Sequence, residues 1–468
     1  MPGILVRGGT IVTDGRSFAG DILIEGGTIV AVEKKIAAAA APGRVIDAAG
    51  CHVFPGGVDP HVHLELETAN GTSSDDFASG SRAALAGGTT TILDFVTPRR
   101  GESLLAALAA RRAAASRSWC DYGLHMSVTA WDAKRLPELE TCCQREGILS
   151  VKTYLAYKET IGLDDGEFLA VLDAARRLNF LAMVHAESGE MVSYLQEKLL
   201  AQGKNTPASH PLSRPADVEG DAVRRALLMA RLAGVPLYVV HVSTRQGIEA
   251  VGAARQAGQT AIAETCPHYL LLDESPYQGD PGSAAAFVMS PPLRAAEHQA
   301  ALWEALASGV VQTLATDHCP FSREQKSRFA ASDFTKIPGG VGGIEYRLAL
   351  LYTFGVRPGK ISLARFVDLV STKAAKIFGL YPRKGTIRPG SDADLVVWDP
   401  EIKSTVAAAR QWQRCDHTVY EGLQLHGGPR VVIRRGTPVV EDGRIAADPG
   451  PGEYLPRGRR GRGDEPGR

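Results

Sequence analysis

The sequence predicts an α/β protein built on a (β/α)8 TIM-like barrel, with a composite β-sandwich domain formed by both chain ends. Three observations predict this fold. The length of 468 residues suits a barrel of about 250 residues with substantial additions. Apolar, β-branched runs alternate with helical stretches in the middle of the chain. Short strand-like runs separated by glycine turns occur at both ends.

Eight apolar runs in the middle of the chain are the expected barrel strands, because eight parallel strands close this barrel. They lie at 53–58, 90–95, 122–128, 149–154, 180–185, 237–242, 261–265 and 311–316. Alanine- and leucine-rich segments with apolar residues at helical spacing lie between them, at 104–115, 165–177, 222–233 and 299–307. The alternation of the two kinds of segment indicates repeated βα units.

The two chain ends carry strand-like runs of the same texture, at 4–7, 10–13, 22–25 and 28–32 and again at 394–398, 431–434 and 439–441. We expect the ends to pair into one domain that needs both of them to bury its faces, with two unrelated β caps as the alternative. The expected domains are therefore residues 1–53 and 384–449 for the β domain and 54–383 for the barrel. Residues 450–468 are rich in Gly, Pro and Arg, and we expect them to be disordered unless they bind another subunit.

The composition excludes several classes of partner. Basic and acidic residues balance at 52 each, so no net charge favours a nucleic acid or an anionic membrane. The apolar runs are far shorter than the roughly 20 residues that span a bilayer, and the N-terminus lacks the features of a signal peptide. We expect a cytoplasmic protein with reduced cysteines that acts on a small molecule.

Potential metal ligands stand at or near the ends of five expected barrel strands. The working residues of such barrels lie at the carboxyl ends of the strands. His61 and His63 point the same way because they are two residues apart in an extended segment. This pair alone is a weak signal, but together the strand ends predict a metal centre. The candidates are His61, His63, Lys152, His185, His241 and Asp317.

Lys152 lies within an apolar strand, where a charged amine is costly unless it is paired. One interpretation is a buried ion pair. The other is an amine that loses its proton and takes up CO2, giving a carbamate whose two oxygens can bridge two cations. The strand alone leaves both interpretations open.

Several longer motifs resemble the hydantoinase/dihydropyrimidinase family of the amidohydrolase superfamily, over roughly residues 1 to 445. They are FPGGVDPHVH at 54–63, GGTTT at 87–91, KTYLAY at 152–157, ETCP at 264–267, SPPLR at 290–294, ATDHCP at 315–320, KGTI at 384–387 and GSDAD at 390–394.

The resemblance implies a site with two divalent metal ions, most simply Zn2+, with Mn2+ or Co2+ compatible with the same ligands. It implies that His61, His63 and Asp317 hold one ion, that His185 and His241 hold the other, and that carboxylated Lys152 and a hydroxide bridge both. Asp317 would act as general base and then acid. The resemblance also implies a homotetramer.

The resemblance further implies the residues that bind a cyclic amide substrate. Tyr157 would donate a hydrogen bond to the tetrahedral intermediate. Main-chain groups near Ser290 and Gly339 would bind the amide-imide edge, although Gly339 stands where the family usually has asparagine. Side chains at three further positions would shape the pocket for the exocyclic group, and the nearby Glu67-Thr68 replaces a usual Pro-Phe pair. These positions are Leu64, Leu66 and Tyr154.

The expected function is the metal-dependent hydrolytic ring opening of hydantoins or dihydropyrimidines to N-carbamoyl amino acids. Tyr157 argues against an allantoinase, and the lack of an arginine beside His61-Val62-His63 argues against a dihydroorotase. A non-catalytic scaffold of the same fold is a further alternative, but all the expected ligands are present. We expect His318 to support Asp317, and the other seven histidines to be structural or surface residues. These seven are His52, His125, His210, His268, His298, His417 and His426.

Overall fold

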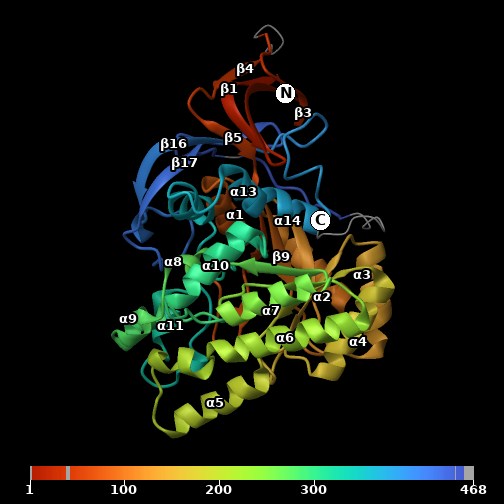
Figure 1. The fold of residues 1–468 in the computed structure, drawn as a ribbon, viewed down its shortest axis with the longest axis vertical. Coiled ribbons are helices and arrows are strands. Elements are labelled where there is room, and N and C mark those ends of the chain that lie inside the picture. Colours follow the sequence, from red (N-terminus) through yellow and green to blue (C-terminus); the bar gives the residue numbers. More distant parts are fainter. Residues whose placement is uncertain (1–2, 38–42, 448, 458–468) are drawn as a thin grey trace.

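The computed structural model describes residues 3–37, 43–447 and 449–457. Figure 1 shows a β-rich domain at the top, formed by red N-terminal and blue C-terminal strands, and a helix-covered barrel below it. The two ends of the chain thus meet in one layer while the middle of the chain forms the other.

The barrel is an eight-stranded parallel sheet, as expected from the eight apolar runs, and its strands follow one another in sequence order. A parallel bridge between Val62 and His318 joins the first strand to the segment after the last one, which closes the ring. The strands are β6 (Gly57–Val62), β9 (Thr89–Val96), β10 (Asp121–Ser127), β11 (Ser150–Tyr154), β12 (Leu181–His185), β13 (Leu237–Val239), β14 (Ala261–Thr265) and β15 (Val311–Leu314).

A buried arginine holds this closing seam. Arg347 donates hydrogen bonds to the carbonyl of Val58 on β6 at 3.0 Å and to the carbonyl of Leu314 on β15 at 2.9 Å. Thr316 adds a hydrogen bond of 2.6 Å to Asp59. The first and last strands are therefore fastened by side chains as well as by the bridge, which sets the relative position of the residues that follow them.

Helices cover the outside of the barrel, and Figure 1 shows α4, α6 and α7 running across its surface. Their ends follow local sequence signals: Asp164 caps α4 through a capping box with Glu167, and Gly234 ends α6 in the left-handed conformation. The helices are α1 (Phe77–Ala86), α2 (Leu104–Ala115), α3 (Leu136–Gln144), α4 (Asp165–Leu178), α5 (Gly189–Ala201), α6 (Ala216–Ala233), α7 (Arg245–Gln256), α8 (Pro267–Leu271), α9 (Pro281–Ala285), α10 (Glu297–Ser308), α11 (Arg323–Ser327), α12 (Arg347–Leu351), α13 (Leu363–Val367) and α14 (Lys373–Ile377).

The composite β domain expected from the two chain ends is confirmed, since their strands form one continuous nine-stranded sheet. The ends meet where β16 pairs antiparallel with β5, with Leu395 opposite Pro55. Ile11 and Val53 share a buried core with Leu395 and Ile433. The strands are β1 (Ile4–Thr13), β2 (Arg16–Glu25), β3 (Thr28–Glu33), β4 (Arg44–Asp47), β5 (His52–Pro55), β16 (Leu395–Thr405), β17 (Gln424–Arg434), β18 (Thr437–Glu441) and β19 (Arg444–Ile445).

The first expected barrel strand, at 53–58, is in fact two strands of two different sheets. β5 belongs to the composite sheet and β6 to the barrel. Only Gly56 separates them, and a Cβ at this position would lie 2.2 Å from Oγ1 of Thr90. The chain passes from one sheet to the other without a polar loop, so the sequence shows a single apolar run.

The expectation of a disordered tail at 450–468 is wrong for residues 450–457. Tyr122 donates a main-chain hydrogen bond to Glu453 at 2.9 Å, and Leu455 donates one to Tyr122 at 2.7 Å. Leu455 is buried with Phe95 and Phe378 in a cluster inside the barrel. The low apolar content of the tail suggested disorder, but one leucine and one tyrosine in it pack against the rest of the protein. Residues 458–468 lie outside the described residues.

Two further features concern the helices as possible membrane spans and the state of the cysteines. None of the helices in the described ranges combines the length and the apolar character needed to cross a membrane. The seven cysteines are buried and form no disulfide bond, as expected from their irregular spacing.

Candidate active site

Three of the expected ligands converge at the carboxyl end of the barrel. Nε2 of His61 lies 3.1 Å from Nε2 of His63. Both nitrogens approach the same oxygen of Asp317, at 3.2 and 3.3 Å. The residues come from β6 and from the segment after β15, which the closing seam of the barrel brings together. Three potential ligand atoms therefore surround one point.

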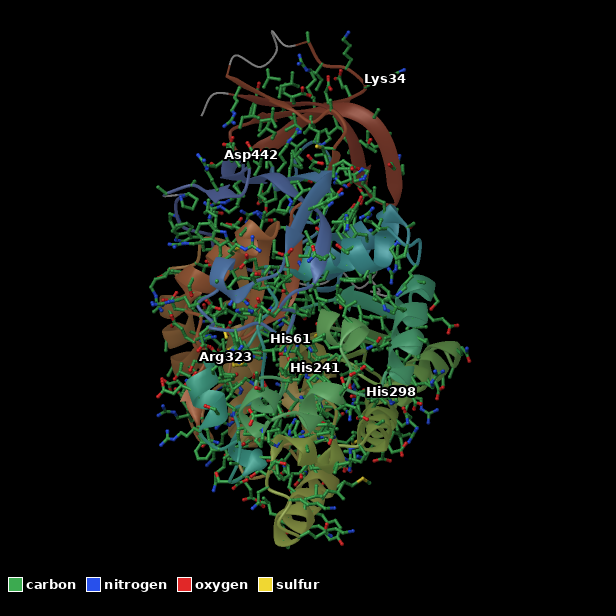
Figure 2. The ribbon with its side chains drawn as sticks, turned by 90° about the vertical axis from the view of Figure 1, so that its left-hand side faces the viewer. Lys34, His61, His241, His298, Arg323 and Asp442 are labelled. Atoms are coloured by element: carbon green, nitrogen blue, oxygen red, sulfur yellow. The ribbon has the colours of Figure 1, made fainter. Side chains whose placement is uncertain are left out.

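A second pair of histidines lies beside the first. Nδ1 of His185, at the end of β12, is 3.0 Å from Nε2 of His241, which follows β13. The ring centroids of His61 and His241 are 5.5 Å apart. Figure 2 shows the labelled His61 and His241 close together in the middle of the molecule. The four histidines and Asp317 are thus one cluster, as the strand ends predicted.

Two buried carboxylates determine which ring nitrogen of His61 and which ring nitrogen of His185 faces the neighbouring histidine. Nδ1 of His61 lies 2.7 Å from Glu264, and Nε2 of His185 lies 2.8 Å from Glu187. Burial lowers the pKa of both histidines, so each ring carries its one proton toward the carboxylate. The other nitrogen then presents a lone pair to the neighbouring histidine. Two ring nitrogens about 3 Å apart suit a shared cation once the partner nitrogen also presents its lone pair, so this donor set fits metal binding.

Lys152 on β11 completes the cluster. Its side chain is almost fully buried, with Nζ 5.0 Å from the ring centroid of Phe95 and 5.1 Å from that of Tyr154. Burial lowers its pKa to about 8, although Asp317 and Glu264 act to raise it. Within the described part of the chain Lys152 forms no ion pair, so a buried ion pair does not explain its position. An amine of this pKa is partly uncharged near neutral pH.

The backbone at two of these positions is strained. His241 has a φ of 39° and Asp317 a φ of 48°, in the left-handed region that favours glycine. Such conformations persist where the surrounding structure imposes them, and they concentrate at functional sites. Here they turn both side chains from the strand ends toward the shared point.

A cavity of about 670 Å³ opens above the cluster. The expected substrate residues Leu66, Tyr154, Tyr157, Ser290 and Gly339 all line it. Residues 67–70 also line it; they form β7 (Glu67–Thr68) and the turn of a short hairpin with β8 (Gly71–Thr72). Ligands and substrate residues therefore share one space.

Leu64 does not line this cavity, which corrects the expectation for this residue. Its side chain is fully buried in a core cluster with Phe77 of α1. A Cβ at Gly80 of the same helix would lie only 2.3 Å from the Leu64 side chain. Alternation explains the difference, because His61 and His63 face inward and the next residue points to the opposite side. Glu65 then breaks the alternation with a left-handed φ of 48°, so Leu66 faces the cavity although it is two residues after Leu64.

Tyr157 lies beside the second histidine pair, with its ring centroid 5.1 Å from that of His185. The side chain of Ser290 lies close enough to its hydroxyl to act against the rise of its pKa. Burial raises the pKa of Tyr157 to about 12, so the phenol keeps its proton at neutral pH and can act as a donor. Its φ of 60° is again left-handed.

Ser290 and Gly339 face each other across the cavity wall. A Cβ at Gly339 would lie 3.5 Å from Oγ of Ser290, an ordinary contact. Among the described residues, no protein group forms a hydrogen bond with the main-chain N–H or C=O of either residue. These main-chain groups are available to a ligand. Gly340, by contrast, has a φ of 146°, and a Cβ there would lie 2.4 Å from the carbonyl of Cys319.

Several supporting residues were not identified from the sequence. Arg214 forms a buried ion pair with Glu187, and Tyr238 donates a hydrogen bond to Glu264 at 2.6 Å. Glu264 stands inside an apolar strand, and Glu187 comes two residues after His185. The position of Glu264 resembles the one that singled out Lys152, so the same signal could have identified it, whereas Glu187 lies beyond the end of β12.

Two histidines differ from expectation in detail. His210 lines the cavity, but its Nε2 is occupied by a hydrogen bond of 2.7 Å to the carbonyl of Met289. His318 does not contact Asp317 directly through its ring. Its Nε2 lies 3.0 Å from Asp75 and its Nδ1 accepts a hydrogen bond from Gly343. It holds the segment that carries Asp317 rather than the carboxylate.

Comparisons with known proteins agree with this geometry. The model of the amidohydrolase family matches residues 52–439. D-hydantoinase of Geobacillus stearothermophilus is 42% identical over 98% of this chain and 97% of its own length. Dihydropyrimidinase of Rattus norvegicus is 39% identical over 97% of this chain and 88% of its own. The solved structure of dihydropyrimidinase from Brevibacillus agri NCHU1002 superposes with a TM-score of 0.95 at 41% identity, covering 98% of this chain and 100% of that one. The strand-end cluster, the barrel and these full-length matches lead to one conclusion: the chain is a cyclic amidohydrolase that belongs to the hydantoinase/dihydropyrimidinase family of the amidohydrolase superfamily.

Proposed function

We propose that this protein opens the ring of hydantoins or dihydropyrimidines by hydrolysis, giving N-carbamoyl amino acids. The observation that carries the proposal is the position of the two histidine pairs, Asp317 and Lys152 on the floor of a cavity that Tyr157 also lines. Relatives named D-hydantoinase and dihydropyrimidinase support the substrate class.

The proposed cofactor is a pair of divalent cations, Zn2+ in the first place and Mn2+ or Co2+ as compatible alternatives. His61, His63 and Asp317 would hold one ion, and His185 and His241 the other. Lys152 would bridge the two after its uncharged amine adds to CO2 and releases a proton. Ions bound in this way lower the pKa of water from about 15.7 toward 7 and so supply hydroxide at neutral pH.

The protein's own residues have separate tasks in this reaction. Asp317 accepts the proton of the attacking water and passes it to the ring nitrogen that leaves. Tyr157 donates a hydrogen bond to the carbonyl oxygen as it becomes an oxyanion, which its raised pKa permits. The free main-chain groups of Ser290 and Gly339 bind the amide-imide edge and orient the ring.

The assembly and location are part of the same proposal. We infer a cytoplasmic homotetramer. Five large apolar side chains on or near α5 and α6 are exposed and would be buried if these helices lay at an interface between subunits. They are Met191, Tyr194, Leu212, Leu228 and Leu232. Light scattering of the purified protein measures the subunit number directly.

A substrate panel tests the proposed reaction. Purified protein is incubated in parallel with hydantoin, dihydrouracil and allantoin, and the ring-opened product is measured. We expect turnover of hydantoin or dihydrouracil, and none by an Asp317→Asn variant. Turnover of allantoin alone would make the protein an allantoinase, and no turnover of any ring would favour the scaffold alternative.

A further inference from the structure

We propose that Lys326 is a positioning residue that sets the distance between the two segments that bind the substrate, residues 288–290 and 338–340. This inference rests on the proposed function, because it assigns to those segments the amide-imide edge of the ring. It adds a residue that contacts neither the cavity nor the ligand cluster.

The contacts of Lys326 carry the inference. Lys326 lies in α11, and its Nζ donates hydrogen bonds to the carbonyl of Val288 at 2.6 Å and to the carbonyl of Pro338 at 3.1 Å. Val288 precedes Ser290 by two residues, and Pro338 directly precedes Gly339. A single amine thus connects the main chains of both segments immediately beside their ligand-facing residues.

The cost of burying this amine indicates that the connection is specific. Lys326 is only 1% exposed, and within the described ranges it forms no ion pair with a carboxylate. Burial lowers its pKa to about 7. Burying an ammonium group without a counter-charge is unfavourable unless hydrogen bonds compensate. The two carbonyls provide that compensation for the protonated form, whose charge-assisted bonds are stronger than neutral ones, and they accept hydrogen bonds from the uncharged amine as well.

Further contacts occupy the main-chain carbonyls that precede Ser290. The carbonyl of Val288 also accepts a hydrogen bond from the N–H of Gly340 at 3.0 Å. The carbonyl of Met289 accepts the bond from His210. The main-chain oxygens before Ser290 are therefore occupied, whereas those of Ser290 and Gly339 remain free. Lys326 is the residue that touches both segments from outside the cavity.

The helix that carries Lys326 is itself held in place. Ser322 caps its first turn, and the N–H of Arg323, labelled in Figure 2, donates to Asp416 at 2.9 Å. Gln325 donates to the carbonyl of Thr72 at 3.0 Å, in the β7–β8 hairpin whose residues 67–70 line the cavity. α11 therefore contacts this hairpin as well as the two segments that Lys326 connects.

The test compares two variants. Lys326→Met removes the ammonium group and keeps an unbranched side chain. Lys326→Gln keeps a hydrogen-bond donor on a shorter side chain, which can reach one of the two carbonyls but not both. The control is Lys336→Met, since Lys336 lies in the same part of the chain but is exposed and pairs only with Asp333. For each protein kcat, KM, metal content and thermal midpoint are measured with hydantoin and dihydrouracil. The metal content and the thermal midpoint report a purely structural effect.

We expect Lys326→Met to raise KM about tenfold or more while kcat changes much less, because the loss affects substrate binding and not the reacting groups. Lys326→Gln should lie between this variant and the wild type, with metal content unchanged in both. The control should match the wild type. If Lys326→Met does not fold, Lys326→Gln decides on the same criteria.

Two results would overturn the assignment of Lys326. One is a KM equal to that of the wild type in a folded variant. The other is a parallel loss of metal, kcat and thermal stability, which would make Lys326 a structural residue only. Failure of the proposed function is distinguishable, because then the wild-type protein itself would open none of the rings.

Discussion

Glu187 accepts a hydrogen bond from Nε2 of His185 at 2.8 Å and is itself held by the buried guanidinium of Arg214. The arrangement leaves Nδ1 of His185 as the nitrogen that faces His241. A carboxylate behind a histidine ligand fixes the tautomer and the orientation of the ring. The second histidine pair thus depends on a residue that lies outside the ligand set.

Replacing Glu187 should therefore weaken metal binding without removing a ligand. We expect Glu187→Gln to lower the affinity of one of the two ions about 10- to 100-fold. Metal content measured at increasing chelator concentrations checks this. Glu190→Gln, at an exposed position on α5, is the matched control and should behave as the wild type. Equal metal retention in both variants would show that Glu187 does not orient His185.

Removing the side chain of Lys152 should remove the proposed bridge between the ions. We expect Lys152→Ala to purify with fewer than two ions per subunit and with little activity. A short carboxylic acid such as acetate can occupy the space and supply two bridging oxygens, so added acetate should restore part of both. A Lys152→Ala protein that binds two ions without any added acid would contradict the carbamate.

Tyr157→Phe should affect the chemical step. Loss of one oxyanion donor costs about 10²- to 10³-fold in kcat, and we expect KM and metal content to change little. Steady-state kinetics on the substrate preferred by the wild type measures this. Tyr381→Phe, whose hydroxyl bonds to Asp14 in the composite β domain and which does not line the cavity, serves as the control. A kcat close to that of the wild type would exclude Tyr157 as the donor.

The two glycines at 339 and 340 should differ in their tolerance of a side chain. Gly339 has room for a Cβ and no left-handed φ, so Gly339→Asn should fold normally and change mainly KM. Gly340→Ala would place a Cβ 2.4 Å from a carbonyl oxygen at a φ of 146°, and should lose thermal stability. Thermal midpoints and KM values compare the two. Equal stability of both variants would contradict the contacts described for Gly340.

The C-terminal segment should contribute to stability through Leu455, which is buried inside the barrel. A leucine-to-alanine change in a core costs about 2–5 kcal/mol, so Leu455→Ala should unfold at a clearly lower urea concentration. Val45→Ala, at a position on β4 that is 42% exposed, is the control. An unchanged midpoint for Leu455→Ala would mean that the segment does not pack there in solution.

The barrel and the clustering of the four histidines with Asp317 could be predicted from the sequence because both follow local periodicity. Strand runs alternate with helices, and these residues stand at strand ends, which a parallel barrel brings to one face. The same rule of alternation, applied one residue further, would have placed Leu64 in the core and not in the pocket.

Other features required the tertiary structure. Glu264 meets His61 across 203 residues of sequence, and Lys326 meets two loops that no local pattern relates to it. The packing of residues 450–457 depends on a space inside the barrel floor that composition does not reveal. The division of residues 53–58 between two sheets could not be predicted either, because an apolar strand has the same sequence pattern in either sheet.

Titration of the metal-free protein with Zn2+ tests the central claim most directly, with ring opening of hydantoin and dihydrouracil followed at each addition. We expect activity to be absent without metal and to rise to a plateau near two ions per subunit. Full activity in thoroughly chelated protein, or no activity at any metal content, would contradict the two-metal mechanism.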